Sequence, residues 1–332
     1  MPFSDLPRGV ILDLADQLDN AGLNALSRTN SQVYDLLNGY LYRRDLTQTR
    51  SRSLLWAVDK EAQAIGTIQQ AIDASRHFDP IPESFHTALQ VTVKEGRAHP
   101  VKLLLKVKGI NPNFGESSHT PLALAAKGNH AAVVELLLAV ANIDPNVIVN
   151  SLGEHILTYS ASHGHTKVAI LKLLLDRPDI DPNVVGADKF GRPALTWASE
   201  PAVVKLFLKR EDIDVNRQDN LGYTALLRAA CSDNLKIAKL LLDRDDINVN
   251  LPDKDGRTPL FCACYYSCLS IVSLLLERDD VSLNYRGNNG HTPLACACHL
   301  DCIAHVRAAS FSPSCHTLTS FSPRYGSQRR RR

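Results

Sequence analysis

The sequence predicts a mainly α-helical protein built from stacked repeats, a solenoid. A phrase returns along the chain: a Gly-x-Thr-Pro-Leu opening, an Ala-rich stretch, a run of leucines and a closing Asp-x-Asn. The closing asparagines are separated by 33, 37, 33, 34 and 34 residues and are Asn113, Asn146, Asn183, Asn216, Asn250 and Asn284. A nearly constant period of this length indicates units that pack on their neighbours in the chain.

The helices of one unit can be located from its residues. In the clearest unit, Gly256 suits a tight turn, the hydroxyl of Thr258 can cap a helix, and Pro259 suits the first helical position. A second helix carries its apolar residues on one stripe, at Ile271, Val272, Leu275 and Leu276. Each unit is therefore predicted to be a turn, a helix, a second helix and a loop.

Composition favours a folded protein without a membrane span. The 332 residues are 44% hydrophobic and 22% charged. No stretch approaches the roughly 18 to 20 consecutive apolar residues of a transmembrane helix, and the start at residues 1–5 lacks the features of a secretion signal. We therefore expect an intracellular protein, cytoplasmic or nuclear, with no membrane partner and with its eight cysteines as free thiols.

Charge is distributed unevenly along the chain. Residues 1–306 carry 31 basic and 35 acidic side chains, whereas six arginines and no acidic residue follow. The net charge of −4 over residues 1–306 argues against a nucleic-acid partner. Residues 307–332, which end in four arginines, are predicted to be a disordered basic tail.

The units resemble ankyrin repeats. Thr-Pro-Leu or a close variant opens a unit at residues 87–89, 120–122, 224–226, 258–260 and 292–294. Two units are less regular: the one from Leu157 has two additional residues around 163–165, and the one from Leu195 is three residues short at Glu200 and Pro201. The resemblance covers about residues 50 to 306 and implies an ankyrin solenoid.

This organisation predicts four segments. They are a helical domain at 1–48, a degenerate first repeat and linker at 49–84, ankyrin repeats at 85–306 and the tail at 307–332. In the last unit Ala308, Ala309 and Ser310 stand where the preceding unit has three leucines. We therefore expect its second helix, near 303–312, to be frayed or missing.

The first segment resembles an F-box, in particular the form that precedes ankyrin arrays in fungal proteins. It opens with Leu-Pro and is rich in leucine over about forty residues. The resemblance implies that residues 3–45 bind a Skp1-type adaptor. The adaptor-facing apolar side chains would be Leu6, Pro7, Val10, Ile11, Leu14 and Leu18. The alternative is a helical cap that shields the first repeat.

Candidate chemistry is explained by the repeat itself. Cys262, Cys264 and Cys268 recur 34 residues later as cysteines, at positions where other units have small residues. They are predicted to pack as small hydrophobic side chains rather than to bind zinc. The sequence contains neither a catalytic histidine arrangement nor a phosphate-binding Gly-x-x-x-x-Gly-Lys loop. We predict no enzyme activity, no catalytic residue, no metal and no cofactor.

The ankyrin resemblance implies a partner-binding surface at two repeat positions. The first position is the turn residue after the glycine. In successive units it is His119, Glu154, Arg192, Tyr223, Arg257 and His291. The positions just past the Ala-rich helix hold Lys127, Ser162, Cys231, Tyr265 and Tyr266. Among these, the tyrosines are expected to be the main anchors because they offer large contact area at a small cost in rotamer entropy. The alternative is that these residues are solvated loop tips.

Together the two resemblances predict a non-enzymatic substrate receptor. The repeats would hold an unknown protein target, and the F-box would connect it to a Skp1–cullin-type ubiquitin ligase. The alternative is a scaffold or adaptor made of ankyrin repeats, without a link to ubiquitin.

Overall fold

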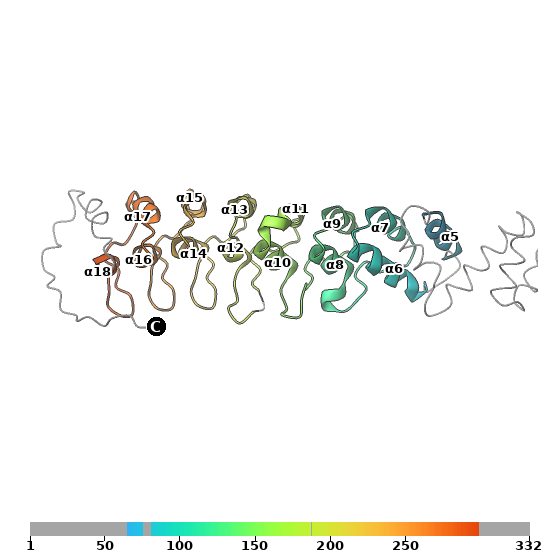
Figure 1. The fold of residues 1–332 in the computed structure, drawn as a ribbon, viewed down its shortest axis with the longest axis horizontal. Helices are drawn as coiled ribbons and strands as arrows, with labels where there is room; N and C mark the ends of the chain where they lie inside the picture. The colour runs from blue at the N-terminus through green and yellow to red at the C-terminus, as the bar shows by residue number, and fades with distance from the viewer. Residues whose placement is uncertain (1–64, 76–80, 187, 299–332) are drawn as a thin grey trace, which may run out of the picture. The chain divides into compact units, whose positions relative to one another are not determined.

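The computed structural model describes residues 65–75, 81–186 and 188–298. The secondary structure of these residues is helical, apart from isolated antiparallel bridges between Ile148 and His155 and between Val185 and Pro193. The chain forms two compact units, one ending at Ile213 and the other beginning at Asp214. Within each unit, paired helices form an inner row and an outer row, and the loops project from the side of the inner row (Figure 1).

The unit that ends at Ile213 contains five described helix pairs or parts of pairs. Its helices are α5 (Ile65–Ser75), α6 (Glu83–Lys94), α7 (Ala98–Leu104), the short 3-10 helix η2 (Ser117–His119), α8 (Pro121–Lys127), α9 (Ala131–Leu138), α10 (Ile156–Ser162), α11 (Gly164–Leu175), α12 (Ala194–Trp197) and α13 (Pro201–Phe207). The inner helices α6, α8, α10 and α12 pack in succession, as do the outer helices α7, α9, α11 and α13.

The unit that begins at Asp214 repeats the same plan. Its described helices are α14 (Ala225–Cys231), α15 (Leu235–Leu242), α16 (Pro259–Tyr265), α17 (Leu269–Leu276) and α18 (Pro293–Cys298). The inner helices α14, α16 and α18 pack in succession, and α15 packs on α17. The prediction of a mainly α-helical repeat fold is therefore confirmed for the described residues.

Several predictions lie outside the described residues. They concern the F-box-like segment at 3–45, the alternative cap, the tail at 307–332 and the second helix of the last unit near 303–312. The proposed domain boundaries therefore stay predictions.

The predicted helix caps are present in the regular units. The hydroxyl oxygens of Thr120, Thr224 and Thr258 accept hydrogen bonds from the backbone N–H three residues later, at 3.4, 3.1 and 3.3 Å. This contact satisfies one of the otherwise unpaired N–H groups at each helix start. Thr87 does not cap a helix, because it lies inside α6, which already begins at Glu83. The Thr87 hydroxyl instead donates to the carbonyl of Glu83.

The two irregular units deviate where the sequence predicted. The insertion around 163–165 lies at the start of α11, where Lys167 has non-helical backbone angles of φ −114° and ψ 18°. The shortened unit has an inner helix, α12, of only four residues. Neither α10 nor α12 has a side-chain cap, since His155 and Pro193 occupy the capping positions.

Buried leucine, valine and isoleucine side chains form the core between the two rows. In the outer helices these are the predicted stripes, for example Ile271, Val272 and Leu275, each no more than 2% exposed. Leu276, the fourth predicted member of this stripe, is half-buried. Each fully buried side chain of this kind contributes about 1.5 to 3 kcal/mol, so one helix pair is stable only with neighbours on its faces.

The closing asparagines, which revealed the period, connect successive repeats. In the second unit Asn250 Nδ2 donates to the carbonyl of Asp280 at 2.6 Å, and Asn250 Oδ1 accepts from the N–H of Ser282 at 2.7 Å. Asn216 makes the same pair of bonds to Asp246 and Asn248. In the first unit Asn113 does so to Asn142 and Asp144. One side-chain amide thus pairs with the backbone of the next loop, as a neighbouring strand would.

The residue two positions before this asparagine holds the backbone of the asparagine in a turn. Asp144, Asp181 and Asp214 each accept a hydrogen bond from the backbone N–H of the asparagine two residues later, at 2.8 to 3.0 Å. Asn248 fills the same role for Asn250 at 3.0 Å. Turns of this kind are characteristic of Asp and Asn, which explains the residue choice.

A repeated arginine strengthens the same loops. Arg177, Arg210, Arg244 and Arg278 each form an ion pair with an aspartate two residues later, at 2.6 to 2.8 Å. Arg210 also donates to the carbonyls of Leu175 and Ile180 in the preceding repeat. Hydrogen bonding from these arginines lowers the pKa of the paired aspartates.

We expect Asn250→Asp to destabilise the protein by about 2 kcal/mol, because a carboxylate cannot donate to the carbonyl of Asp280. The matched control is Asn248→Asp in the same loop, which should change the free energy of unfolding by less than about 0.5 kcal/mol. Aspartate already occupies the equivalent positions 144, 181 and 214. Urea denaturation measures both variants, and equal effects would contradict the bridging role of Asn250.

Candidate protein-binding surface

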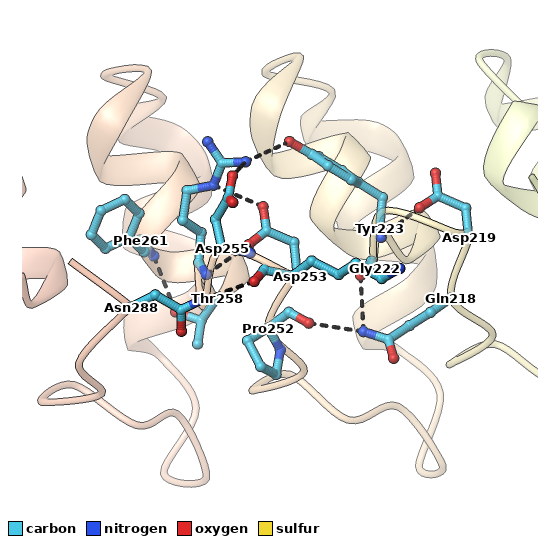
Figure 2. Close-up of polar contacts among 12 residues, drawn as sticks. Gln218, Asp219, Gly222, Tyr223, Pro252, Asp253, Asp255, Thr258, Phe261 and Asn288 are labelled. Carbon is cyan, nitrogen blue, oxygen red and sulfur yellow. Dashed lines mark hydrogen bonds and ion pairs between the residues drawn. The ribbon is translucent and has the colours of Figure 1, made fainter. Parts of the chain in front are cut away.

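Two buried aspartates organise the loops that precede α14 and α16. Asp219 Oδ1 accepts hydrogen bonds from the N–H groups of Leu221 and Tyr223, at 2.8 and 2.9 Å. Asp253 Oδ1 does the same for Asp255 and Arg257, at 3.0 and 2.8 Å. Figure 2 shows these aspartates inside their turns. Each carboxylate therefore holds the turn that presents the residue after the glycine.

Each buried carboxylate also has an arginine partner. Arg257 Nε contacts Asp253 at 2.7 Å, and a second nitrogen of Arg257 contacts the exposed Asp255 at 2.6 Å. Asp219 instead pairs with Arg228, which lies on helix α14, at 3.2 Å. Charge-assisted hydrogen bonds of this type satisfy a buried carboxylate, so the two arginines are held close to their loops.

Tyr223 lies between these two arginines. Arg257 donates a hydrogen bond to the Tyr223 hydroxyl oxygen at 3.2 Å, and the guanidinium carbon of Arg228 lies 5.5 Å from the centre of the Tyr223 ring. Burial raises the pKa of the Tyr223 hydroxyl to about 12, and the positive charge of Arg257 opposes this shift. Tyr223 and Arg257, predicted separately as partner-binding residues, are thus in direct contact across two repeats.

A side-chain amide also joins successive loops (Figure 2). Gln218 Nε2 donates to the carbonyls of Gly222 and Pro252, at 2.9 and 2.8 Å. The loops approach so closely that a Cβ on Gly222, whose φ is +83°, would lie 2.8 Å from the Cα of Asp253. Only glycine fits this backbone conformation and this spacing without displacing the next loop.

Among the residues that the structure describes, the most exposed aromatic pair lies at the end of α16. Tyr265 and Tyr266 are 51% and 49% exposed, and their rings meet edge to face with centroids 5.0 Å apart. Tyr265 also stacks with Phe261 one turn earlier, at 6.5 Å. We call Tyr223, Arg257, Tyr265 and Tyr266 the tyrosine surface. Burial raises the pKa of Tyr266, while the charge of Arg257 acts in the opposite direction.

The remaining predicted positions of this unit differ in exposure. His291 is exposed in the loop before α18, where its backbone N–H bonds to Asn289 Oδ1. Cys231 is half-buried at the end of α14. Both stay predicted contact residues, and neither is needed to define the tyrosine surface.

In the first unit, the Lys127 side chain contacts its own repeat, whereas the His119 backbone contacts the preceding repeat. Lys127 Nζ donates to the carbonyl of Ser118 at 2.9 Å, so this lysine ties the end of α8 to the short helix η2 that precedes it. Burial lowers its pKa. The carbonyl of His119 accepts from Gln90 Nε2, while its ring is exposed. Of these two predicted positions, His119 has the freer side chain.

Glu154 and Ser162 are likewise engaged within the chain. Glu154 Oε2 accepts from Asn150 Nδ2 at 2.6 Å. The Ser162 hydroxyl donates to the carbonyl of Tyr159 at 2.9 Å and lies at the same distance from His163 Nδ1. Binding through either residue would have to replace these internal contacts.

Arg192 contacts two aromatic rings. Its guanidinium carbon lies 4.4 Å from the ring centres of both Phe190 and Trp197. These cation–π contacts hold the side chain against its repeat. Lys189 Nζ lies 4.9 Å from the centre of the same Phe190 ring. As with Glu154, this predicted contact residue has a structural role in the first unit.

Sequence reasoning missed Lys167, whose side chain is almost fully buried. Its Nζ donates to the carbonyls of Ala126 and Lys127 at the end of α8 and lies 5.2 Å from the centre of the Tyr159 ring. Burial lowers its pKa. The only signal in the sequence was the two-residue insertion around 163–165, which directly precedes this lysine.

Comparison with known proteins identifies the repeats. A family model described as ankyrin repeats (3 copies) matches residues 54–149, 157–253, 199–285 and 246–309. The chain belongs to the ankyrin-repeat family. These matches begin at residue 54, so they do not include the F-box-like segment at 3–45.

Solved structures of other ankyrin-repeat proteins resemble this one. The ankyrin repeat domain of Bcl-3, a member of the IkappaB protein family, is 25% identical with a TM-score of 0.58, over 66% of this chain and 97% of that one. The ankyrin repeat protein EF0377 is 25% identical with a TM-score of 0.52, over 57% and 97%. No curated protein sequence matches the chain significantly.

Family membership indicates protein–protein interaction, since ankyrin repeats are interaction modules and nothing in these matches points to catalysis. Within residues 65–75, 81–186 and 188–298 there is no cluster of three or more potential metal ligands. In the same described residues, no helix has the length and apolar character needed to cross a membrane.

The pKa of Tyr223 predicts a pH dependence. An ordinary tyrosine has a pKa of 10, whereas Tyr223 in the folded protein has a pKa of about 12. Between these values the folded state keeps a proton that the unfolded state has lost. The stability that depends on this proton is therefore complete below pH 10 and is lost as the pH rises towards 12.

Tyr223→Phe has no proton to lose, so we expect its free energy of unfolding to fall less steeply than that of the wild type between pH 10 and 12. Below pH 10 the variant should be less stable by about 1 kcal/mol, because the hydrogen bond from Arg257 is missing. Urea denaturation at fixed pH measures both effects. Equal slopes in the two proteins would contradict the assignment.

Proposed function

We propose that this protein is a non-enzymatic binding module that holds a protein target on the tyrosine surface. The observation that carries the proposal is the exposure of Tyr265 and Tyr266, about half of each side chain, in a repeat whose other large apolar residues are mostly buried. Tyrosines combine a large apolar ring with a polar hydroxyl, and they are enriched among the residues that dominate binding energy.

The neighbouring residues support this assignment. Arg257 and Tyr223 are held by hydrogen bonds and ion pairs before any partner binds. Side chains that are already ordered lose less rotamer entropy on binding.

The double variant Tyr265→Ser/Tyr266→Ser tests the surface. Immobilised full-length protein should capture its target from a cell extract, and the variant should capture it at least about tenfold less well, which corresponds to about 1.4 kcal/mol. Quantitative mass spectrometry of the captured proteins provides the measurement. Since both side chains are half exposed, the variant should keep the helical circular dichroism of the wild type.

Tyr285→Ser is the matched control. Tyr285 is also exposed, at 37%, but it lies in the loop after Asn284 and outside the tyrosine surface. Its variant should capture the same proteins as the wild type. If the double variant also captures the same proteins in the same amounts, the tyrosine surface is not the binding site.

We further propose that residues 3–45 connect the bound target to a Skp1-type adaptor of a cullin-type ubiquitin ligase. Support for this step comes from the sequence resemblance to the F-box, in which Leu6, Pro7, Val10, Ile11, Leu14 and Leu18 would form the adaptor-binding side chains. An interaction module joined to such an adaptor would act as a substrate receptor. The alternative function is a scaffold without a link to ubiquitin.

A pulldown with a purified Skp1-type adaptor distinguishes these functions. The substrate-receptor proposal expects the wild type to bind the adaptor and Leu6→Ala/Pro7→Ala to lose it. Tyr265→Ser/Tyr266→Ser should still bind, because the two surfaces are separate in the sequence. A wild-type protein that does not bind the adaptor would favour the scaffold and would leave the tyrosine surface to be judged by its own test.

A further inference from the structure

The loop before α12 contains an arginine that no carboxylate neutralises. Arg192 and Arg257 both follow a turn glycine, and both stand four residues after an aspartate, Asp188 or Asp253. Arg257 binds Asp253 and Asp255 through its guanidinium. Asp188 instead accepts from the backbone N–H of Arg192, at 3.5 Å. Within the described residues, the guanidinium of Arg192 forms neither an ion pair nor a hydrogen bond.

One residue explains why the two arginines differ. Phe190 stands at the position of Asp255, two residues before the arginine. The loop therefore has a ring where the later loop has a second acid, and the guanidinium carbon of Arg192 lies 4.4 Å from the ring centres of Phe190 and Trp197. Contacts with rings hold a cation but leave its N–H groups without acceptors.

Two N–H groups at this place are buried without a partner. Among the described residues, neither Arg192 Nε nor Trp197 Nε1 has a hydrogen-bond acceptor. Buried donors without an acceptor are uncommon in folded proteins, and each one calls for an explanation such as a ligand. The neighbouring aromatic and cationic groups make an anionic acceptor the natural candidate.

The charge of the loop agrees with an anionic ligand. Residues 188–192 contain two basic side chains and one acidic side chain, a net charge of +1. Net charges of −1, −1, 0 and 0 are found in the equivalent loops at 150–154, 219–223, 253–257 and 287–291. The second basic residue is Lys189, whose Nζ lies 4.9 Å from the centre of the Phe190 ring. Both cations of the loop thus contact the same ring.

The outer edge of the Arg192 guanidinium is accessible. The residue is half-buried, and of its three guanidinium nitrogens only Nε is fully buried without a partner. The Nη1 and Nη2 groups therefore reach the surface with unused N–H donors. Such an edge matches the two oxygens of a carboxylate, with which it forms paired charge-assisted hydrogen bonds. Because the rings already hold the side chain, little rotamer entropy is lost on binding.

We propose that Arg192 and Lys189 form an anion-binding site that holds an aspartate or glutamate side chain from an acidic segment of a protein partner. One carboxylate matches the net charge of +1 in this loop, whereas the nearly double charge of a phosphate group exceeds it. The inference goes beyond the proposed function, because the site lies in the unit that ends at Ile213 and the tyrosine surface lies in the other unit.

The fluorescence of Trp197 tests whether an acidic peptide binds here. The chain has two tryptophans, so Trp56→Phe leaves Trp197 as the single indole. Titration of this full-length variant with a blocked pentaglutamate peptide should change the emission of Trp197 until saturation, because its ring lies 4.4 Å from the guanidinium of Arg192. A blocked pentaglutamine peptide should leave the emission unchanged. The absence of a saturable change overturns the proposal.

Variants of the full-length chain locate the contact. The anisotropy of dye-labelled pentaglutamate measures the affinity, and Arg192→Gln should weaken it at least about tenfold. Phe190→Asp should have a similar effect, because it restores the acid that pairs with Arg257 in the equivalent loop. The matched control is Arg217→Gln, which removes the same charge from an exposed arginine of the other unit and should change the affinity less than about twofold.

Three further outcomes decide the proposal. Equal weakening by Arg192→Gln and Arg217→Gln would indicate a general effect of charge and would overturn it. Inorganic phosphate that displaces the labelled peptide at a lower concentration than unlabelled pentaglutamate does would overturn the choice of a carboxylate. Tyr265→Ser/Tyr266→Ser should bind the peptide as the wild type does, and a loss would place the contact on the tyrosine surface instead. Circular dichroism of each variant excludes loss of folding as the cause.

Discussion

The spacing between repeats depends on a side-chain amide that imitates the backbone. Asn113, Asn216 and Asn250 each donate to a carbonyl of the next loop and accept from an N–H two residues further along. An amide has both a donor and an acceptor in one plane, which a carboxylate or a hydroxyl cannot offer in the same way. This pairing holds the loops of successive repeats at a fixed distance, while buried apolar side chains pack the helices.

The repeat frame could be predicted from the sequence because it depends on local chemistry. Thr258 caps its helix and Pro259 follows at the first helical position, as their residue types require. The irregular units were also visible, since a two-residue insertion and a three-residue deletion break the period. Their consequences were not: the four-residue length of α12 and the buried position of Lys167 result from how neighbouring repeats accommodate the change.

The candidate surface could be predicted only in part. Repeat position identified Tyr223, Arg257, Tyr265 and Tyr266, and residue type favoured the tyrosines as anchors. Neither showed that Lys127 and Glu154 are engaged in hydrogen bonds within the chain. The difference arises from contacts between residues that are distant in the sequence. Arg257 reaches Tyr223 of the preceding repeat, a contact across 34 residues. The repeat period identifies equivalent positions in different repeats. It does not identify which residues of adjacent repeats contact each other.

The three contacts of Arg257 affect how this surface can distinguish between ligands. Its guanidinium is bound to Asp253, Asp255 and the Tyr223 hydroxyl at once. An arginine held in this way cannot swing to follow a mismatched ligand without giving up contacts to two loops. The surface should therefore behave as a stiff template that rejects poorly fitting shapes, rather than as an adaptable one that accommodates many sequences.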